Sequence, residues 1–397
     1  MKQVSDLRVL IDRIPFAEGN IGEEAILTSL LQDLESFGVN QISVLSNQPE
    51  RTRIRHGKRV RVVPDEPARW LSLPAEVRRF DLLIWGGGHM LQDRSSQLYI
   101  PYVVKTLLLA RFLGVPRFIY APGLGPVINQ FGRFLSRLAL KGCRGTVVRD
   151  AGSADFLESI GIRQGVSRTA DPGFSLWTPA DDGSQKAESE TLTIGFAPRR
   201  LFYRKGSVLP MSWQLASQSQ RIPRFESFLE DAAAALDLLI EKRKVQIRLI
   251  PMDVGPNPRD DLICRRLRRY MVHGYAVRAF DDDPPLFEFV RRLGELDLLV
   301  SARLHGIILG LRFGLPFIGI DSDGKIAQLA TSIGRDDCII KDVDFNRDSF
   351  YELAGNVLDR RRELRDELLR TGAELRSRAE ENRRLLGECL NGIVQEQ

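Results

Sequence analysis

The sequence contains few cysteines and no pattern that would join them. Cys143, Cys264, Cys338 and Cys389 are scattered, without a CxxC pair or a regular framework. Such spacing argues for reduced thiols and against both a disulfide scaffold and a structural zinc site. Because His, Cys and carboxylate residues form no ligand-like cluster either, we expect no metal and no cofactor.

Long apolar runs are also missing. No stretch approaches the roughly twenty apolar residues that a membrane-spanning helix needs, and the N-terminal apolar segment is interrupted by Asp6, Arg8, Asp12 and Arg13. Secretion and membrane spanning are therefore disfavoured, and we expect a cytoplasmic location. Arg-rich helices leave open a peripheral contact with the inner face of a membrane.

The net charge of +5 is small for 397 residues, although arginines cluster at 51–61, 265–269 and 360–384. This favours anionic partners only mildly, and without a recognised nucleic-acid module we expect no nucleic acid partner. With 43% hydrophobic and 27% charged residues, the chain has the composition of a globular protein of two or three domains.

Short runs of Val, Ile and Leu alternate with longer amphipathic segments, which predicts an α/β fold of βαβ units with parallel sheets. The strands are expected near residues 8–11, 42–45, 82–85, 118–121, 146–149, 193–197, 247–250, 298–300 and 317–320. The helices are expected near residues 24–37, 103–112, 151–160, 225–241 and 262–270.

The polar stretch between Trp177 and Thr191 divides the alternating pattern. We predict an N-terminal Rossmann-like domain at 1–178, a linker at 179–191, a C-terminal Rossmann-like domain at 192–345 and closing helices at 346–397. Two doubly wound domains of this kind place their strand ends around one cleft, as in a glycosyltransferase-B-like architecture.

The most informative motif is Arg303-Leu304-His305-Gly306, which follows the apolar run beginning at Leu298 and precedes Lys325. A buried strand would deliver these residues to a helix start, where unpaired N–H groups favour anions. Arg303 can grip a carboxylate or phosphate, and His305 can exchange a proton near neutral pH. The alternative is structural: both side chains could cap a helix or pair with acidic neighbours.

Two glycine-rich turns follow predicted strands. The first is Gly19-Asn-Ile-Gly-Glu-Glu, which precedes a predicted helix. Glu23 and Glu24 would stabilise the start of that helix. The turn is either an anion-binding site or only a favourable helix start. The second contains Gly86, Gly87 and Gly88, which indicate a close backbone approach by a ligand or a neighbouring helix. Neither turn is a Walker loop or a GxGxxG motif, so nucleotide hydrolysis and dinucleotide binding are poorly supported.

Other residues at the expected strand ends are open to two interpretations. His89 lines the predicted cleft or faces solvent, and Arg149 contacts an anion or pairs with Asp150 or Asp155. We interpret the turn at Asp171-Pro172-Gly173 as structural.

Taken together, these pieces resemble the polysaccharide pyruvyl transferase family. The matching segments occur in the family's order: Gly19-Asn-Ile-Gly-Glu-Glu-Ala-Ile-Leu, Asp81-Leu-Leu-Ile-Trp-Gly-Gly-Gly, Val148-Arg-Asp, Ala170-Asp-Pro and Ser301-Ala-Arg-Leu-His-Gly with Pro316 and Lys325. The chain departs from the family in having Glu23-Glu24 for the usual Asp-Glu pair, and in lacking an aromatic residue before Lys325.

The resemblance implies transfer of pyruvate from phosphoenolpyruvate to a saccharide of a cell-surface or exopolysaccharide precursor, often lipid-linked. The donor residues it implies are Arg303, Leu304, His305 and Arg149. From the residue chemistry, Lys325 and the helix starts would add donor contacts, and His305 would protonate the donor. Glu23 or Glu24 would act as base or only stabilise the helix start.

Two other functions remain open from the sequence. One is a glycosyltransferase that uses a nucleotide sugar on the same fold, and the other is a saccharide- or anion-binding protein without turnover. The acceptor is not identified by the sequence. The aromatic-bearing segment from Arg200 to Ile222 is our prediction for an acceptor loop.

Overall fold

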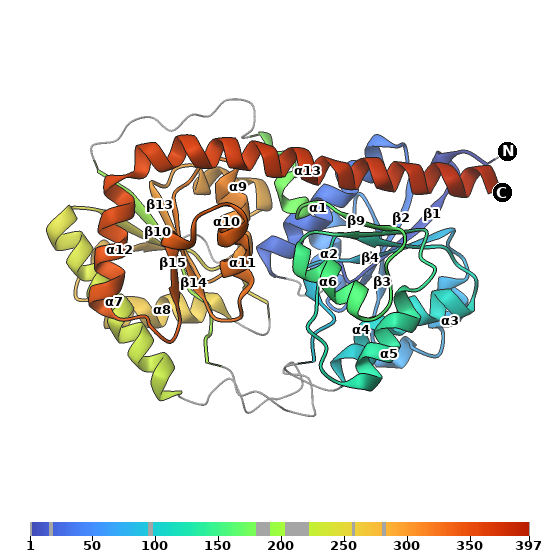
Figure 1. The fold of residues 1–397 in the computed structure, drawn as a ribbon, viewed down its shortest axis with the longest axis horizontal. Coiled ribbons are helices and arrows are strands. Elements are labelled where there is room, and N and C mark those ends of the chain that lie inside the picture. The colour runs from blue at the N-terminus through green and yellow to red at the C-terminus, as the bar shows by residue number, and fades with distance from the viewer. Residues whose placement is uncertain are drawn as a thin grey trace.

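The computed structural model describes residues 2–15, 19–93, 98–179, 191–202, 222–255, 259–279 and 283–396. Two parallel α/β sheets form two Rossmann-like domains that lie side by side (Figure 1). Most of the predicted linker, residues 180–190, lies outside the described residues, as does most of the predicted acceptor loop, residues 203–221.

The N-terminal sheet has seven parallel strands. Their order is β3 (Arg61–Pro64), β2 (Gln41–Ser46), β1 (Arg8–Asp12), β4 (Leu82–Gly86), β6 (Arg117–Tyr120), β8 (Gly145–Val148) and β9 (Val166–Arg168). Its helices are α1 (Ile21–Ser36), α2 (Pro49–His56), α3 (Leu73–Val77), α4 (Tyr99–Phe112), α5 (Gln130–Leu140) and α6 (Ala151–Ser159). A small two-stranded sheet pairs β5 (His89–Met90) with β7 (Gly123–Leu124). Short 3-10 turns are η1 (Val4–Asp6), η2 (Pro67–Arg69) and η3 (Pro172–Phe174).

The C-terminal sheet has six parallel strands. Their order is β12 (Arg278–Ala279), β11 (Gln246–Leu249), β10 (Thr193–Ala197), β13 (Leu298–Ser301), β14 (Phe317–Asp321) and β15 (Ile339–Lys341). Its helices are α7 (Pro223–Arg243), α8 (Asp260–Tyr270), α9 (Leu286–Leu293), α10 (Leu304–Leu311), α11 (Lys325–Ser332) and α12 (Arg347–Asp359), with turns η7 (Gly274–Ala276) and η8 (Asp336–Cys338).

In each sheet the strand order reverses at one point, between β1 and β4 in the first and between β10 and β13 in the second. The two loops that leave the carboxyl ends of such a pair diverge, and this is where open α/β sheets bind ligands. The residues that follow β4 are the three glycines at 86–88, and those that follow β13 include Arg303 and His305. The topology therefore brings the two main sequence motifs to equivalent positions.

The predicted strands and helices are observed with ends shifted by a few residues. Asp150 caps α6, because its carboxylate accepts from the Ser153 backbone N–H at 2.7 Å. The strands that were not predicted are short or half-polar: β3, β5, β7, β9, β12 and β15. Such segments carry little hydrophobic periodicity, so tertiary pairing decides their conformation.

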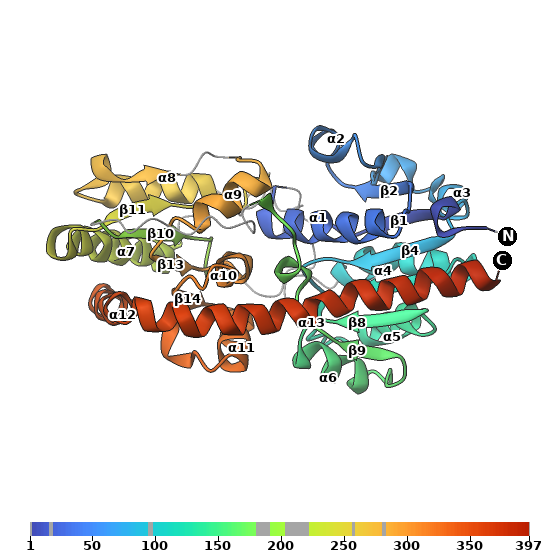
Figure 2. The same cartoon turned by 90° about the horizontal axis from the view of Figure 1, so that it is seen from above.

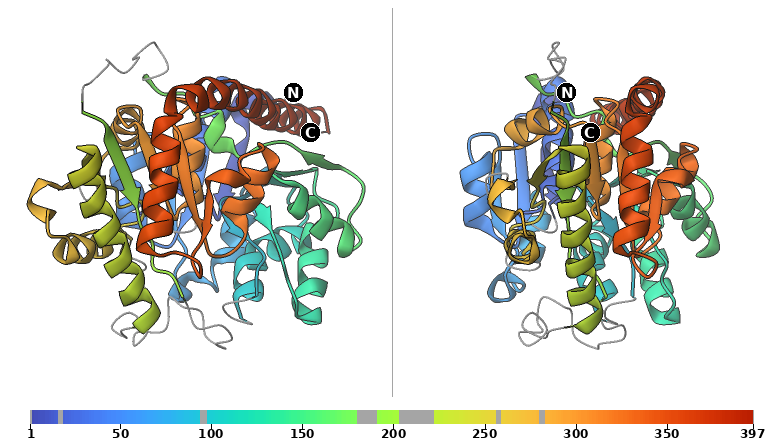
Figure 3. Two further views of the ribbon diagram at one scale, coloured as in Figure 1. Left: turned by 60° about the vertical axis from the view of Figure 1, so that its left-hand side comes forward. Right: turned by 90° about the vertical axis from the view of Figure 1, so that its left-hand side faces the viewer.

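The long helix α13 (Arg361–Glu396) lies across both domains (Figures 2 and 3). Leu364 and Leu368 near its start are buried with the C-terminal core, whereas Leu386 and Leu390 near its end are buried with the N-terminal core. Helix α13 therefore contributes to the hydrophobic cores of both domains. None of the described helices is long and apolar enough to cross a membrane.

We predict that truncating Leu386 loosens the attachment of α13 to the N-terminal domain. Leu386 is fully buried, so Leu386→Ala should lower the free energy of unfolding by about 2–5 kcal/mol, through lost burial and a residual cavity. Urea denaturation measures this change. Leu71→Ala is the matched control, because Leu71 is 97% exposed and the same truncation there should cost under about 0.5 kcal/mol. Equal effects of the two variants would contradict this packing.

Candidate functional site

His305 lies where the two domains meet. It is the second residue of α10, in the C-terminal domain, and its ring packs against Gly22 of α1, in the N-terminal domain. A Cβ atom on Gly22 would lie 2.2 Å from Cγ of His305, so only glycine allows this approach. The His305 side chain keeps 13% of its surface exposed, and it is therefore neither buried within one domain nor sealed from solvent.

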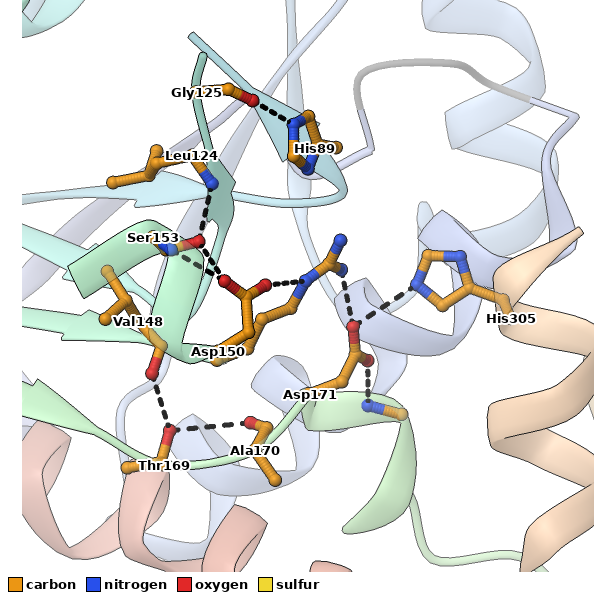
Figure 4. A network of polar contacts seen from close by, with 12 residues as sticks. His89, Leu124, Gly125, Val148, Asp150, Ser153, Thr169, Ala170, Asp171 and His305 are labelled. Carbon is orange, nitrogen blue, oxygen red and sulfur yellow. Dashed lines mark hydrogen bonds and ion pairs between the residues drawn. The ribbon is translucent and has the colours of Figure 1, made fainter. Parts of the chain in front are cut away.

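Asp171 connects His305 to Arg149 (Figure 4). Its Oδ2 atom accepts from Arg149 Nη1 at 2.6 Å and lies 3.5 Å from His305 Nε2, while its Oδ1 atom accepts from the Gly173 backbone N–H at 2.9 Å. Burial alone would raise the pKa of Asp171, but the charges of His305 and Arg149 outweigh it and hold this pKa well below its usual range. A carboxylate here stabilises positive charge on both partners.

The segment before Asp171 is fixed by α13. Asn382, fully buried, accepts from Thr169 Oγ1 at 2.6 Å and donates to the Ala170 carbonyl at 3.1 Å. Arg378 donates to the Thr169 carbonyl at 2.7 Å. The helix that joins the domains thus also sets the position of the carboxylate between them.

Arg149 and Lys325 approach the same place from different domains. Arg149 follows β8 and is buried, and Lys325 is the first residue of α11, which begins at the left-handed Gly324. Lys325 Nζ lies 3.2 Å from Asp323 Oδ2, to which Arg199 also approaches at 3.5 Å. Burial is the main cause that lowers the pKa of Lys325, and the charges of Arg199 and Arg149 act in the same direction.

His89 faces this group of cations. A Cβ atom on Gly123 would lie 2.7 Å from both His89 Nδ1 and Arg149 Nη2, which places the two side chains over the same glycine. Burial, with the charges of Lys325 and Arg149, lowers the pKa of His89 to about 3. His89 is therefore a neutral imidazole at physiological pH, and it is partly buried beside Arg149 instead of facing solvent.

Arg303 is bound by carboxylates of its own domain. Its guanidinium donates to both oxygens of Asp260 at 2.9 and 2.8 Å and lies 3.5 Å from Asp253. Asp253 accepts in turn from the side chain of Asn20, across the domain boundary, at 3.2 Å. Burial raises the pKa of Asp253 to about 6. The arrangement holds the turn before His305 and ties it to the first helix of the other domain.

The three glycines at 86–88 permit close contact within the protein. A Cβ atom on Gly86 would lie 2.4 Å from the Tyr120 carbonyl oxygen, and one on Gly87, whose φ is +106°, would lie 2.2 Å from the Arg13 carbonyl oxygen. On Gly88 it would lie 2.9 Å from Oε1 of Glu23. Neighbouring elements therefore account for these approaches, and Glu23 is brought next to the loop.

Glu24 points elsewhere. It pairs with His56 of α2 and lies 3.9 Å from Arg55. Burial would raise the pKa of Glu24, but these partners lower it overall. Leu304, the remaining residue of the motif, is partly buried against the C-terminal core.

The site thus gathers two carboxylates, Asp171 and Asp323, and several cations that the sequence did not bring together. Asp171, Arg199 and Asp323 are the residues that sequence reasoning did not assign to it, and His89 was left open between two interpretations. For Asp171 a signal existed, because Ala170-Asp-Pro belongs to the family-like pattern. Within the described part of the chain no group of three or more His, Cys, Asp or Glu residues is arranged to hold a metal.

The fold and this site define a glycosyltransferase-B-like protein of two Rossmann-like domains. Among solved structures, the chain is similar to HepE from Anabaena in complex with UDP and glucose, at 12% identity and a TM-score of 0.57, covering 97% of this chain and 99% of that one. It is also similar to the UDP-GlcNAc 2-epimerase of Neisseria meningitidis bound to UDP-GlcNAc, at 10% identity and a TM-score of 0.59, covering 95% and 98%. At these identities the similarity concerns the fold alone.

The polysaccharide pyruvyl transferase family model matches residues 20–324, and the chain belongs to this family. Among curated proteins, it is 22% identical over 333 residues to the amylovoran biosynthesis protein AmsJ of Erwinia amylovora, covering 80% of this chain and 73% of that protein. The family assigns the chain to the transferases of polysaccharide biosynthesis, as the resemblance predicted.

Adding a methyl group at Gly22 tests the contact with His305. Gly22→Ala should displace the imidazole and reduce turnover by about tenfold or more, because an active-site shift of about 1 Å is that costly. Gly392→Ala is the control, since nothing lies within 4 Å of a Cβ atom at that position. Steady-state kinetics and thermal denaturation of both variants measure the effect. Unchanged turnover in Gly22→Ala would contradict the close packing.

Asp171 makes the stability of the protein depend on pH in a defined direction. Its pKa is lower in the folded protein, so the carboxylate contributes stability above the unfolded pKa of about 3.9 and loses it as the pH falls toward the folded value. Asp171→Asn should cost about 3 kcal/mol at neutral pH, because it removes the closer of the two carboxylates that pair with the buried Arg149, at 2.6 Å, and leaves only Asp150 at 3.6 Å. The difference in the free energy of unfolding between the wild type and Asp171→Asn should become smaller below about pH 4.

Urea denaturation of both proteins at neutral and acidic pH measures this difference. Asp366→Asn is the control, because Asp366 is exposed on α13. If the Asp171→Asn difference stayed constant from neutral to acidic pH, the proposed charge contact would not stabilise the fold.

Proposed function

We propose that the protein transfers pyruvate from phosphoenolpyruvate to a saccharide of a cell-surface or exopolysaccharide precursor, forming a ketal. The observation that carries the proposal is the meeting of His305, Asp171, Arg149 and Lys325 at one point between the domains. The membership of the polysaccharide pyruvyl transferase family supports the same reaction class.

Phosphoenolpyruvate carries a carboxylate and a phosphate, so its site needs at least two cationic contacts. Arg149 and Lys325 supply them from opposite domains, and Arg199 adds a third beside Asp323. In the structure each is balanced by a carboxylate. The donor would replace part of these contacts, and the start of α11 would add backbone N–H groups.

Arg303 is part of the proposal as a donor residue, with Leu304 beside it. Its guanidinium lies on Asp260, so direct donor binding requires it to leave that carboxylate. We therefore expect Arg303→Ala to raise KM more than it lowers kcat. The glycines at 86–88 and Glu23 would line the opposite side.

His305 is our proposed general acid. Nε2 of its imidazole is buried without a hydrogen-bond partner in the described part of the chain and lies 3.5 Å from Asp171. As imidazolium it would protonate the methylene carbon of the donor, and Asp171 would stabilise the positive charge. A sugar hydroxyl then attacks the oxocarbenium-like C2 atom, and its proton returns to the imidazole.

Loss of inorganic phosphate and attack by a second hydroxyl close the cyclic ketal. The proton from His305 turns the methylene into a methyl group, and the proton of the second hydroxyl leaves with phosphate, so the atoms balance and no redox partner is needed. Glu23, next to Gly88, is the carboxylate best placed to act as base for the second hydroxyl and to pass its proton on to phosphate. Glu24 pairs with His56, which favours the alternative that Glu24 only stabilises the helix start.

A nucleotide-sugar glycosyltransferase is the second candidate, because HepE, which is similar in fold, was solved with UDP and glucose. Thermal denaturation with phosphoenolpyruvate, UDP-sugars and GDP-sugars separates the two. Stabilisation should follow the true donor. Stabilisation by a nucleotide sugar alone would overturn the pyruvyl transferase proposal.

The direct test is phosphate release from phosphoenolpyruvate with a panel of glycan precursors. His305→Ala should lose about 100-fold to 10,000-fold in turnover while its thermal stability stays close to wild type, since it removes a proton donor. His273→Ala is the matched control, because His273 pairs with Glu241 away from the domain boundary. Full turnover in His305→Ala would exclude this mechanism, and no phosphate release with any acceptor would favour a binding protein without turnover.

A further inference from the structure

One part of the N-terminal domain has a one-sided charge composition. From residue 94 to residue 149 the sequence contains no Asp or Glu, but nine Lys or Arg. In the whole chain the two kinds are nearly balanced, with 52 acidic and 57 basic residues. The segment includes α4 and α5, which pack against each other.

Helix α5 exposes large apolar side chains. Phe131 is 61% exposed and Phe134 is 59% exposed, and Ile128, just before the helix, is 72% exposed. Residues three apart share a face of a helix, so Phe131 and Phe134 form one apolar ridge. We call Ile128, Phe131 and Phe134 the α5 ridge.

Three cations flank the α5 ridge, and one carboxylate lies at its start, where Asp93 accepts from the backbone N–H groups of Ile128 and Asn129. Arg137 and Lys141 are exposed on the same helix and just after it, and Arg111, at the end of α4, donates to the Lys141 carbonyl. No carboxylate of the described residues forms an ion pair with any of the three. On α9, by contrast, Arg291 pairs with Glu288 and Glu295. The surface near α5 is therefore both apolar and cationic.

The ridge lies beside the site. Helix α5 forms the edge of the N-terminal domain opposite α13 (Figure 1). Ile128 is three residues beyond Gly125, whose carbonyl contacts His89 Nε2, and three residues span at most about 11 Å.

We propose that the α5 ridge and its flanking cations dock on a lipid bilayer that contains anionic headgroups. An interfacial helix buries aromatic side chains among the acyl chains and places Lys and Arg at the headgroups, and α5 has this combination. The stems of Arg137 and Lys141 are long enough to reach the headgroups while the rings insert. Docking there would bring the site close to the membrane surface. Such a position would help the site to reach a lipid-linked acceptor, and this last point alone rests on the proposed function.

The experiment is co-sedimentation of the full chain with vesicles, in the absence of donor and acceptor. We expect binding to phosphatidylcholine vesicles with about 30% phosphatidylglycerol, at least about tenfold stronger than to phosphatidylcholine alone. Phe131→Ser/Phe134→Ser should weaken this binding by about tenfold. Arg137→Gln/Lys141→Gln should weaken it by a similar factor and reduce its dependence on salt.

Two controls match these changes. Arg370→Gln/Arg376→Gln removes two positive charges from α13, and Tyr275→Ser/Val272→Ser removes two exposed apolar side chains from the C-terminal domain. Both should bind vesicles as the wild type does. The proposal is overturned if the wild type does not bind anionic vesicles, or if the controls lose as much binding as the α5 variants. It is also overturned if light scattering shows a dimer that Phe131→Ser/Phe134→Ser dissociates, since the ridge would then join two copies of the chain.

Discussion

The carboxylate of Asp171 is the interaction on which the arrangement of the site depends. It is buried between a guanidinium of its own domain and an imidazole of the other. A buried charge is tolerated only when it is paired and hydrogen-bonded. Because its partners come from different domains, any relative movement of the domains changes this balance. The geometry of His305 is therefore a property of the whole molecule rather than of the motif that contains it.

A second constraint follows from the concentration of positive charge. Arg149, Lys325 and Arg199 would repel one another in a site of low dielectric. The structure relieves the repulsion with Asp171 and Asp323, and it keeps His89 neutral. The positive charges of the cations are therefore balanced by carboxylates of the protein. A doubly anionic molecule could bind here by replacing some of these carboxylate contacts. Arg303 is balanced in the same way, because its guanidinium is paired with the carboxylate of Asp260.

The sequence predicted the parts of this structure that depend on local periodicity. The apolar run from Leu298 gives β13, and the residues after it begin α10 as expected. The glycines at 86–88 were correctly expected to allow a close approach, but whether by ligand or protein could not be decided, because the partners are the carbonyls of Tyr120 and Arg13. Local sequence also did not distinguish a structural Asp171 from one that faces His305.

The reason is that pairing across the fold leaves no local mark. Arg303 was expected to hold the donor, and its bidentate contact with Asp260 joins residues 43 positions apart. Asn382 reaches Ala170 over 212 positions. Such contacts depend on how the strands and helices are arranged in space. Sequence periodicity predicts the fold class but not these individual contacts. The domain limits and the roles of the individual site residues remain predictions.

The position of α13 has a consequence for how the active form arises. Both sheets precede this helix in the chain, and one core cluster of the N-terminal domain contains no residue of α13, so it can condense before the helix docks. Until α13 follows, the Thr169–Ala170 backbone lacks Asn382 and Arg378 as partners. A chain whose sheets have formed but whose α13 has not yet docked therefore lacks the contacts that position Asp171 between the two domains.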